Sequence, residues 1–199
     1  HRAAMKLLDR VVDVVAMENS SDELTTRRDF VPPRGKRIGI EVDHVSVKTS
    51  RRDFQAGDLA DALEAANAPN EVLSAYLEHG ENRTGLIFTP TVEQAYDTAK
   101  VFRDAGVPVE ALDGDTPAEE RKAILDRLAK GQTRLVANVG VLTEGYDEPS
   151  LSIVIVASPT KSRSKYCQMI GRGLRLHPAK EDCLTVSYTH LTLPTIYSV

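Results

Sequence analysis

From residue 84 onward, short apolar runs alternate with stretches whose apolar residues recur at the helical period. The apolar runs lack the polar alternation of a half-exposed strand, which indicates strands buried on both faces. This succession is typical of an α/β fold in which helices cover both faces of a parallel sheet. The pattern predicts strands at 86–88, 107–112, 134–139, 151–157 and 184–188, and helices at 92–105, 116–130 and 165–174.

The segment before this succession is less regular. A helical apolar stripe covers residues 3–16, VPPRG at 31–35 predicts a break in regular structure, and residues 36–42 alternate as a strand does. Two short helices are expected at 56–67 and 69–79.

Composition narrows the class of protein. The net charge is −4, so bulk attraction does not hold this chain on nucleic acid, and such a contact needs local sites. No apolar run approaches the ~20 residues of a membrane helix, and we expect a cytoplasmic protein without membrane contact.

Cys167 and Cys183 lack metal-ligand spacing. Two reduced thiols are the favoured interpretation, and a disulfide between them is the alternative. One basic cluster departs from the overall charge: Lys161, Arg163, Lys165, Arg172, Arg175, His177 and Lys180.

Open parallel sheets bind their ligands beyond the carboxyl ends of the strands. The loops at those ends are 89–91, 113–116, 139–149 and 158–163, and we expect the site there.

The sequence QMIGRGLR at 168–175 contains two arginines three residues apart. A helix at this point would place Arg172 and Arg175 on one face, where two guanidinium groups form a clamp for phosphate oxygens. The alternative is a solvated basic helix end. Upstream, VLTEGYDEP at 141–149 offers Gly145 for a tight loop and the Asp147 carboxylate as an acceptor for ribose hydroxyls, although an ordinary loop looks the same.

Two further loops carry polar groups. In LIFTPT a strand end is followed by a helix start, so backbone N–H groups near Thr89 and Thr91 are suited to hold a phosphate. In DGDTP, Thr116 is the expected cap of the next helix, and Asp113 would repel a phosphate if it faced one.

QMIGRGLR resembles motif VI of superfamily 2 DEAD/DEAH-box helicases, VLTEGYDEP resembles motif V, and LIFTPT resembles motif IV. The resemblance covers residues 84–186 and implies a RecA-like second motor domain of the P-loop NTPase superfamily. The stretch 31–80 resembles the bridge into this domain in the branch of restriction-enzyme motors and DNA-repair-type bacterial and phage helicases.

The resemblance also implies roles. Arg175 would be an arginine finger towards the γ-phosphate of ATP, and Arg172 its companion. Gln168, Gly145 and Asp147 would contact the nucleotide. The nucleic-acid backbone would be contacted by Thr89, Pro90, Thr91, Gly114, Asn138 and Thr143.

Neither a G-x-x-x-x-G-K-S/T phosphate loop nor a D-E-x-D/H acid pair is present in the sequence. The sequence SDEL at 21–24 resembles the acid pair only in part, and no apolar strand precedes it. We therefore expect ATP and Mg²⁺ to be bound mainly by a preceding RecA-like domain of the same polypeptide, and this chain alone to lack ATPase activity. The substrate would be nucleic acid, DNA rather than RNA. Two rivals are a dinucleotide enzyme, which would need an absent G-x-G-x-x-G, and a non-catalytic relative that only binds nucleic acid or partners.

Four segments are expected: 1–30 as a remnant of the preceding motor domain, 31–80 as a connecting segment, 81–186 as the helicase C-terminal domain, and 187–199 as a tail. The sequence SYTHLTLPTIYSV in the tail resembles a translated sequencing-adapter read-through and is excluded from fold reasoning.

Overall fold

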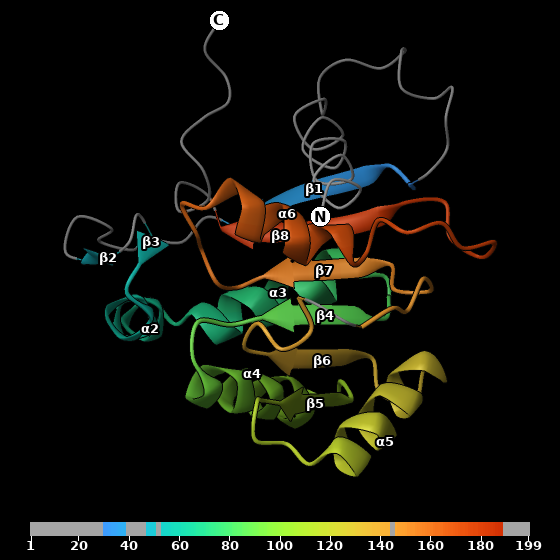
Figure 1. Cartoon of the computed structure of the whole chain (residues 1–199), viewed down its shortest axis with the longest axis horizontal. Helices are drawn as coiled ribbons and strands as arrows, with labels where there is room; N and C mark the ends of the chain where they lie inside the picture. The colour runs from blue at the N-terminus through green and yellow to red at the C-terminus, as the bar shows by residue number, and fades with distance from the viewer. Residues whose placement is uncertain (1–29, 39–46, 51–52, 144–145, 189–199) are drawn as a thin grey trace, which may run out of the picture.

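A computed structural model describes residues 30–38, 47–50, 53–143 and 146–188. Its centre is a six-stranded sheet in the order β1-β8-β7-β4-β6-β5, and every neighbouring pair is parallel (Figure 1). The predicted parallel α/β fold is confirmed. The strands are β1 (Pro33–Ile38), β4 (Gly85–Phe88), β5 (Val109–Leu112), β6 (Leu135–Asn138), β7 (Ile153–Val156) and β8 (Cys183–Tyr188). A small antiparallel pair, β2 (Thr49–Ser50) and β3 (Asp53–Phe54), is separate from this sheet.

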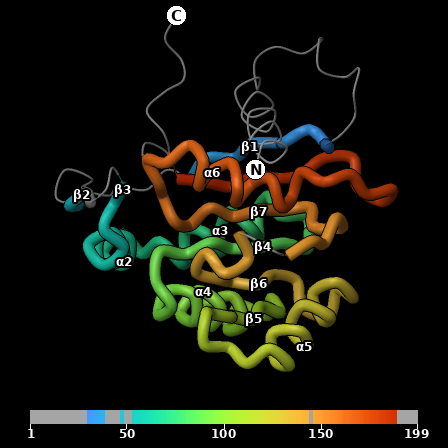
Figure 2. Tube along the Cα trace, in the orientation of Figure 1, coloured from blue at the N-terminus to red at the C-terminus, as the bar shows by residue number. Residues whose placement is uncertain are grey.

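Helices cover both faces of the sheet, as the apolar strands predicted. Residues of α2 (Ala56–Ala65), α3 (Ala68–His79) and α4 (Val92–Asp104) pack into one hydrophobic core. Residues of α5 (Ala118–Ala129) and α6 (Arg163–Gly171) pack into a second core on the other face. The chain trace shows the sheet running between these two layers (Figure 2).

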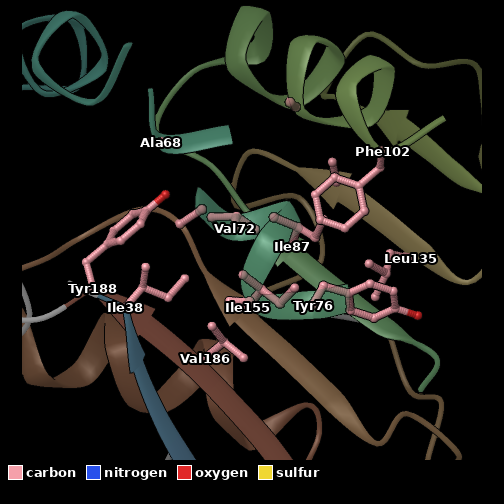
Figure 3. Packing of buried hydrophobic residues seen from close by; sticks show 14 of the residues in the cluster. Ile38, Ala68, Val72, Tyr76, Ile87, Phe102, Leu135, Ile155, Val186 and Tyr188 are labelled. Carbon is pink, nitrogen blue, oxygen red and sulfur yellow. The ribbon is translucent and has the colours of Figure 1, made fainter. Parts of the chain in front are cut away.

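Alternate side chains of each central strand divide between the two cores. On β4, Ile87 belongs to the first core, while Leu86 and Phe88 belong to the second, and all three are at most 1% exposed. In the first core the ring centroids of Tyr76 and Phe102 lie 5.7 Å apart (Figure 3). Burial on both faces explains why these strands read as unbroken apolar runs.

Three sequence expectations about elements are wrong. Residues 31–35 were expected to break regular structure, but β1 begins at Pro33, because proline is tolerated at the first residue of an edge strand. The last helix ends at Gly171 rather than at 174. Thr116 does not cap α5: Pro117 occupies the N-cap position without a side-chain cap bond, and the Thr116 hydroxyl donates to Asp113 inside the preceding turn.

Several predictions fall outside the described residues: the helix at 3–16, the second half of the strand at 36–42, Gly145, and most of the tail. The described part of the tail, Ser187 and Tyr188, completes β8, and Tyr188 is buried in the first core. The segment boundaries and the origin of the tail stay predictions. Within the described ranges, no helix combines the length and apolarity needed to cross a bilayer.

Candidate functional site

The predicted site residues lie in two groups at different ends of the sheet. The first group follows the carboxyl ends of β4, β5 and β6, and we call it the carboxyl edge: 89–91, 113–116 and Asn138. The second is the arginine turn, residues 172–175, directly after α6. The crossing loop, residues 139–152 apart from 144–145, runs from the end of β6 to the start of β7 and contacts both.

At the first loop of the carboxyl edge, threonine side chains organise the start of α4. The Thr91 hydroxyl accepts a hydrogen bond from the Gln94 N–H at 3.3 Å and so caps the helix. The Thr89 hydroxyl is buried and donates to the Thr91 carbonyl at 3.1 Å. Thr91 and Pro90 are partly exposed and Thr89 is internal, so the first two are better placed for a ligand.

Asn138 ties the crossing loop to the central strand. Its side chain is fully buried; the amide donates to the Ile87 carbonyl at 3.1 Å and accepts from the Leu142 N–H at 3.3 Å. The contact with nucleic acid stays a prediction. In this structure the amide satisfies two backbone groups inside the protein, as buried polar groups require.

The loop after β5 directs its acid inward. The Asp113 carboxylate accepts hydrogen bonds from the N–H groups of Asp115 and Thr116, both at 2.9 Å. Desolvation acts to raise the pKa of Asp113, but these bonds and one from the Thr116 hydroxyl hold it below its usual value. Arg121 donates to the Asp113 carbonyl at 3.0 Å. The charge of Asp113 is thus engaged by its own turn and by the Tyr96 hydroxyl of α4 at 3.3 Å, beside the exposed Gly114.

The arginine turn differs from its predicted geometry. Because α6 ends at Gly171, Arg172 and Arg175 do not share a helix face, and that prediction is wrong. A Cβ on Gly173 would overlap the Cys183 sulfur and lie 2.7 Å from Val154 Cγ2, so only glycine allows this close approach to the sheet. Leaving the helix lets the chain pair as an isolated bridge between Arg175 and Phe30.

Both arginines turn towards the crossing loop. Arg172 donates from Nε to the Thr143 carbonyl at 3.1 Å and from Nη1 to the Tyr146 carbonyl at 2.6 Å. Arg175 forms an ion pair with Asp147. The side chains of Arg175 and Asp147 are 32% and 63% exposed, so this pair is accessible from solvent. Four predicted residues are therefore brought together: Arg172, Arg175, Asp147 and Thr143.

The arginine turn lies towards the amino ends of the strands. The Leu174 carbonyl accepts from the Val31 N–H at 2.8 Å, two residues before β1 begins. The loops at the carboxyl ends therefore hold only part of the predicted site, because α6 starts after the end of β7 and runs back across the sheet. Gln168 is partly exposed on α6, one turn before Arg172.

Lys180 holds the trailing end of the crossing loop. The sequence did not distinguish it from the other residues of the basic cluster. Lys180 is 9% exposed, and its ammonium donates to the carbonyls of Pro149, Leu151 and Gly173 at 2.7, 2.7 and 2.9 Å. Burial lowers its pKa from the ordinary 10.5. A surface lysine and a buried one look the same in a single sequence, so no signal could have found it.

Asp53 was also missed. Its carboxylate accepts from the Thr160 hydroxyl at 2.7 Å and from the Lys161 N–H at 2.8 Å, which attaches β3 to the loop after β7. Desolvation opposes the shift, but these bonds lower the pKa of Asp53. The contacts span more than a hundred residues and have no local sequence signature.

A hollow of about 430 Å³ lies between α5 and the crossing loop. Its lining includes the cations Arg121 and Lys122, the hydroxyl-bearing Thr116 of the carboxyl edge, and Tyr146 of the crossing loop. The hollow therefore connects the carboxyl edge with the crossing loop on one side of the molecule.

Comparison with known proteins gives consistent matches. The family described as "Helicase conserved C-terminal domain" matches residues 68–177. IRC3 of Saccharomyces cerevisiae, named as an ATP-dependent helicase, is 30% identical over 190 residues, which cover 94% of this chain and 28% of IRC3. The DNA 3'-5' translocase XPB2 of Sulfurisphaera tokodaii is 27% identical over 156 residues, covering 74% of this chain and 34% of XPB2.

A solved structure agrees on the fold. A fragment assigned to the HsdR subunit of a type I restriction enzyme from Vibrio vulnificus superposes with a TM-score of 0.61 at 21% identity, covering 81% of this chain and 32% of that one. The parallel sheet and its helices define the class, a RecA-like domain of the helicase type. The chain belongs to the helicase conserved C-terminal domain family, in the superfamily 2 branch that includes IRC3 and XPB2.

Proposed function

We propose that this domain is the second motor half of an ATP-dependent helicase or translocase, and that it acts on DNA rather than RNA. One observation carries the proposal: Arg172 and Arg175 converge with Asp147 on one partly exposed loop, as the clamp for an anionic ligand requires. The chain spans 28% of the length of IRC3, so we assign a preceding RecA-like domain to the rest of the protein.

The donor set fits the polyphosphate of ATP. Arg175 gives one of its five N–H groups to Asp147, and a phosphate oxygen can take the place of that carboxylate. ATP supplies the phosphoryl group, and the two guanidinium groups stabilise the charge that develops on it. Asp147, once released, is positioned to accept a hydrogen bond from a ribose hydroxyl, with Gly145 and Gln168 as the remaining nucleotide contacts.

Mg²⁺ takes oxygen ligands, chiefly carboxylates, phosphates and water. Among the described residues no group of three or more His, Cys, Asp or Glu side chains would hold a metal ion. We assign Mg²⁺ to the preceding domain, with this domain supplying cationic charge to the nucleotide through Arg172 and Arg175.

The carboxyl edge would carry the nucleic-acid backbone. The candidate contacts of this edge are the first backbone amides of α4 with Thr91, and the exposed Gly114. Thr143 on the neighbouring crossing loop is a further candidate. The crossing loop begins at Asn138 and reaches Asp147, so one segment joins the two ligands. The name of XPB2 supports DNA as the substrate. A cytoplasmic location stays a prediction.

The test is ATPase activity of the full-length protein with single-stranded DNA, with RNA and without nucleic acid. We expect DNA to stimulate turnover most, and the affinity for DNA to fall with salt and to depend little on sequence. The isolated 199-residue chain should show no turnover above background. Turnover that neither nucleic acid changes would refute the motor assignment.

A further inference from the structure

Lys180 is unusual because its charged end is buried with no carboxylate at ion-pair distance among the described residues, although the charge of Glu148 acts on it from farther away. The ammonium lies 2.7 Å from the carbonyls of Pro149 and Leu151 and 2.9 Å from that of Gly173. Lysine is almost never this buried unless its charge is compensated. Three carbonyl oxygens match the three N–H donors of the ammonium, so each donor has a partner.

The three carbonyls belong to two segments that meet only in the tertiary structure. Pro149 and Leu151 lie at the trailing end of the crossing loop, directly before β7. Gly173 lies inside the arginine turn, next to Arg172 and two residues before Arg175. The ammonium therefore joins the end of the crossing loop to the peptide that carries both arginines.

Arg172 makes the complementary attachment. It donates to the carbonyls of Thr143 and Tyr146 in the middle of the same loop. Two cations thus hold the crossing loop at two points, and both are anchored at the arginine turn. The Gly173 peptide has little freedom to shift, because the Cys183 and Val154 side chains fill the space beside its Cα.

We propose that Lys180 is a positioning residue for the arginine pair. By fixing the Gly173 carbonyl against the end of the crossing loop, it sets the direction in which Arg172 and Arg175 leave the turn. The proposal rests on the proposed function, because it assumes that these arginines act on a phosphoryl group. Such positioning affects the rate of the reaction, since a ~1 Å misplacement of a catalytic group can lower the rate about a hundredfold.

The test is Lys180→Met in the full-length protein, which keeps the length of the side chain and removes all three donors. We expect kcat of the DNA-stimulated ATPase to fall at least about tenfold, while KM for ATP stays within a few-fold. Should the methionine variant not fold, Lys180→Gln retains two donors and is measured in its place.

Arg83→Met is the matched control. Arg83 is also a largely buried cation that donates to a backbone carbonyl, that of Ser152 at 3.1 Å, and it pairs with Asp182. It therefore holds the start of β7 as Lys180 does, but it has no bond to Gly173. We expect this variant to lose a similar amount of thermal stability and to keep kcat within about twofold.

A kcat that falls equally in both variants would overturn the positioning role, since general destabilisation would then explain it. Amide hydrogen exchange separates this result from failure of the motor assignment. Faster exchange at 171–176 in Lys180→Met, but not in Arg83→Met, supports the clamp even if the parent protein proves to have no DNA-stimulated ATPase. Unchanged exchange there refutes the clamp.

Discussion

The carboxyl edge and the arginine turn hold their polar side chains in different ways. In the two loops of the carboxyl edge, Thr91 and Asp113 are held mainly by local bonds: Thr91 accepts from the Gln94 N–H and Asp113 from the Thr116 N–H, each across three residues, whereas Asn138 at the end of β6 reaches Ile87 across 51. At the arginine turn the bonds are distant: Arg172 reaches Tyr146 across 26 residues, and Lys180 reaches Pro149 across 31. A local turn forms wherever its own residues are present, whereas the arginine turn depends on the whole sheet being assembled.

This difference separates what a substitution should do at each end. A change at Thr91 or Asp113 should remain close to the turn that carries it. A change at the arginine turn should disturb the crossing loop, which is attached at both the turn and Asn138. The four predictions that follow test this contrast.

The largest effect is expected for Arg175→Ala. Removing a guanidinium that stabilises charge on the transferred phosphoryl group should lower the DNA-stimulated ATPase rate by about a thousandfold or more. Affinity for DNA should stay within a few-fold, because the carboxyl edge is untouched. Steady-state turnover and fluorescence-detected DNA binding measure the two quantities.

Arg163→Ala is the control for that variant, since Arg163 is an exposed arginine at the first position of α6. It should leave turnover within about twofold of the parent rate, well below the effect of losing a finger. Full activity in Arg175→Ala would show that this side chain is no finger.

A smaller effect is expected for Gly173→Ala. The new methyl group would meet Cys183 and Val154, and overpacking of this kind costs about 1–3 kcal/mol. Gly57→Ala is the control: nothing lies within 4 Å of its Cβ position inside α2, so it should stabilise by up to ~1 kcal/mol. Denaturant unfolding of both variants measures the difference. Equal stability would mean that the turn moves freely away from the sheet.

At the carboxyl edge, Thr91→Ala should cost about 1 kcal/mol through loss of the α4 cap. Ser162→Ala removes the corresponding cap of α6 and should cost a similar amount. Only Thr91→Ala should also weaken DNA binding, by a few-fold, which a titration with labelled single-stranded DNA would reveal. Equal DNA affinity in the two variants argues against the carboxyl edge as the DNA contact.

The smallest effect concerns pH. The pKa of Asp113 is held below its ordinary 3.8, mainly by hydrogen bonds from Thr116 that outweigh desolvation. Its contribution to stability is therefore complete above pH 3.8 and is lost as the pH falls through the lower folded pKa.

An NMR titration of the amides of Asp115 and Thr116 would follow that loss, with Asp113→Asn as the variant that no longer titrates. Because Asp147 is itself an acid paired with Arg175, the titration is repeated with Asp147→Asn, which should leave the transition at Asp115 and Thr116 unchanged; a loss of that transition would contradict the separation of the two ends.

Much of the fold was predictable from the residues. The strands β4, β6 and β7 are apolar on both faces, and the helices between them carry a 3.6-residue period, so a parallel sheet with two helical layers follows. The local features of the carboxyl edge were also accessible, because caps and Asx-type turns depend on residues two to four positions apart. Even so, Thr116 was assigned to the wrong role, since Asp113 competes for its hydroxyl.

The sequence by itself determined which residues could form strands, helices and caps, and it marked Arg172 and Arg175 as a pair. The tertiary structure alone decided that α6 ends before both arginines and that both side chains contact the crossing loop. It also decided that Lys180 is buried and bonded to the Gly173 carbonyl between them. The physical reason is range: propensity and periodicity act between near neighbours. The Gly173 contact with Cys183 and the bonds of Lys180 to Pro149 and Leu151 arise only after strands distant in sequence have paired.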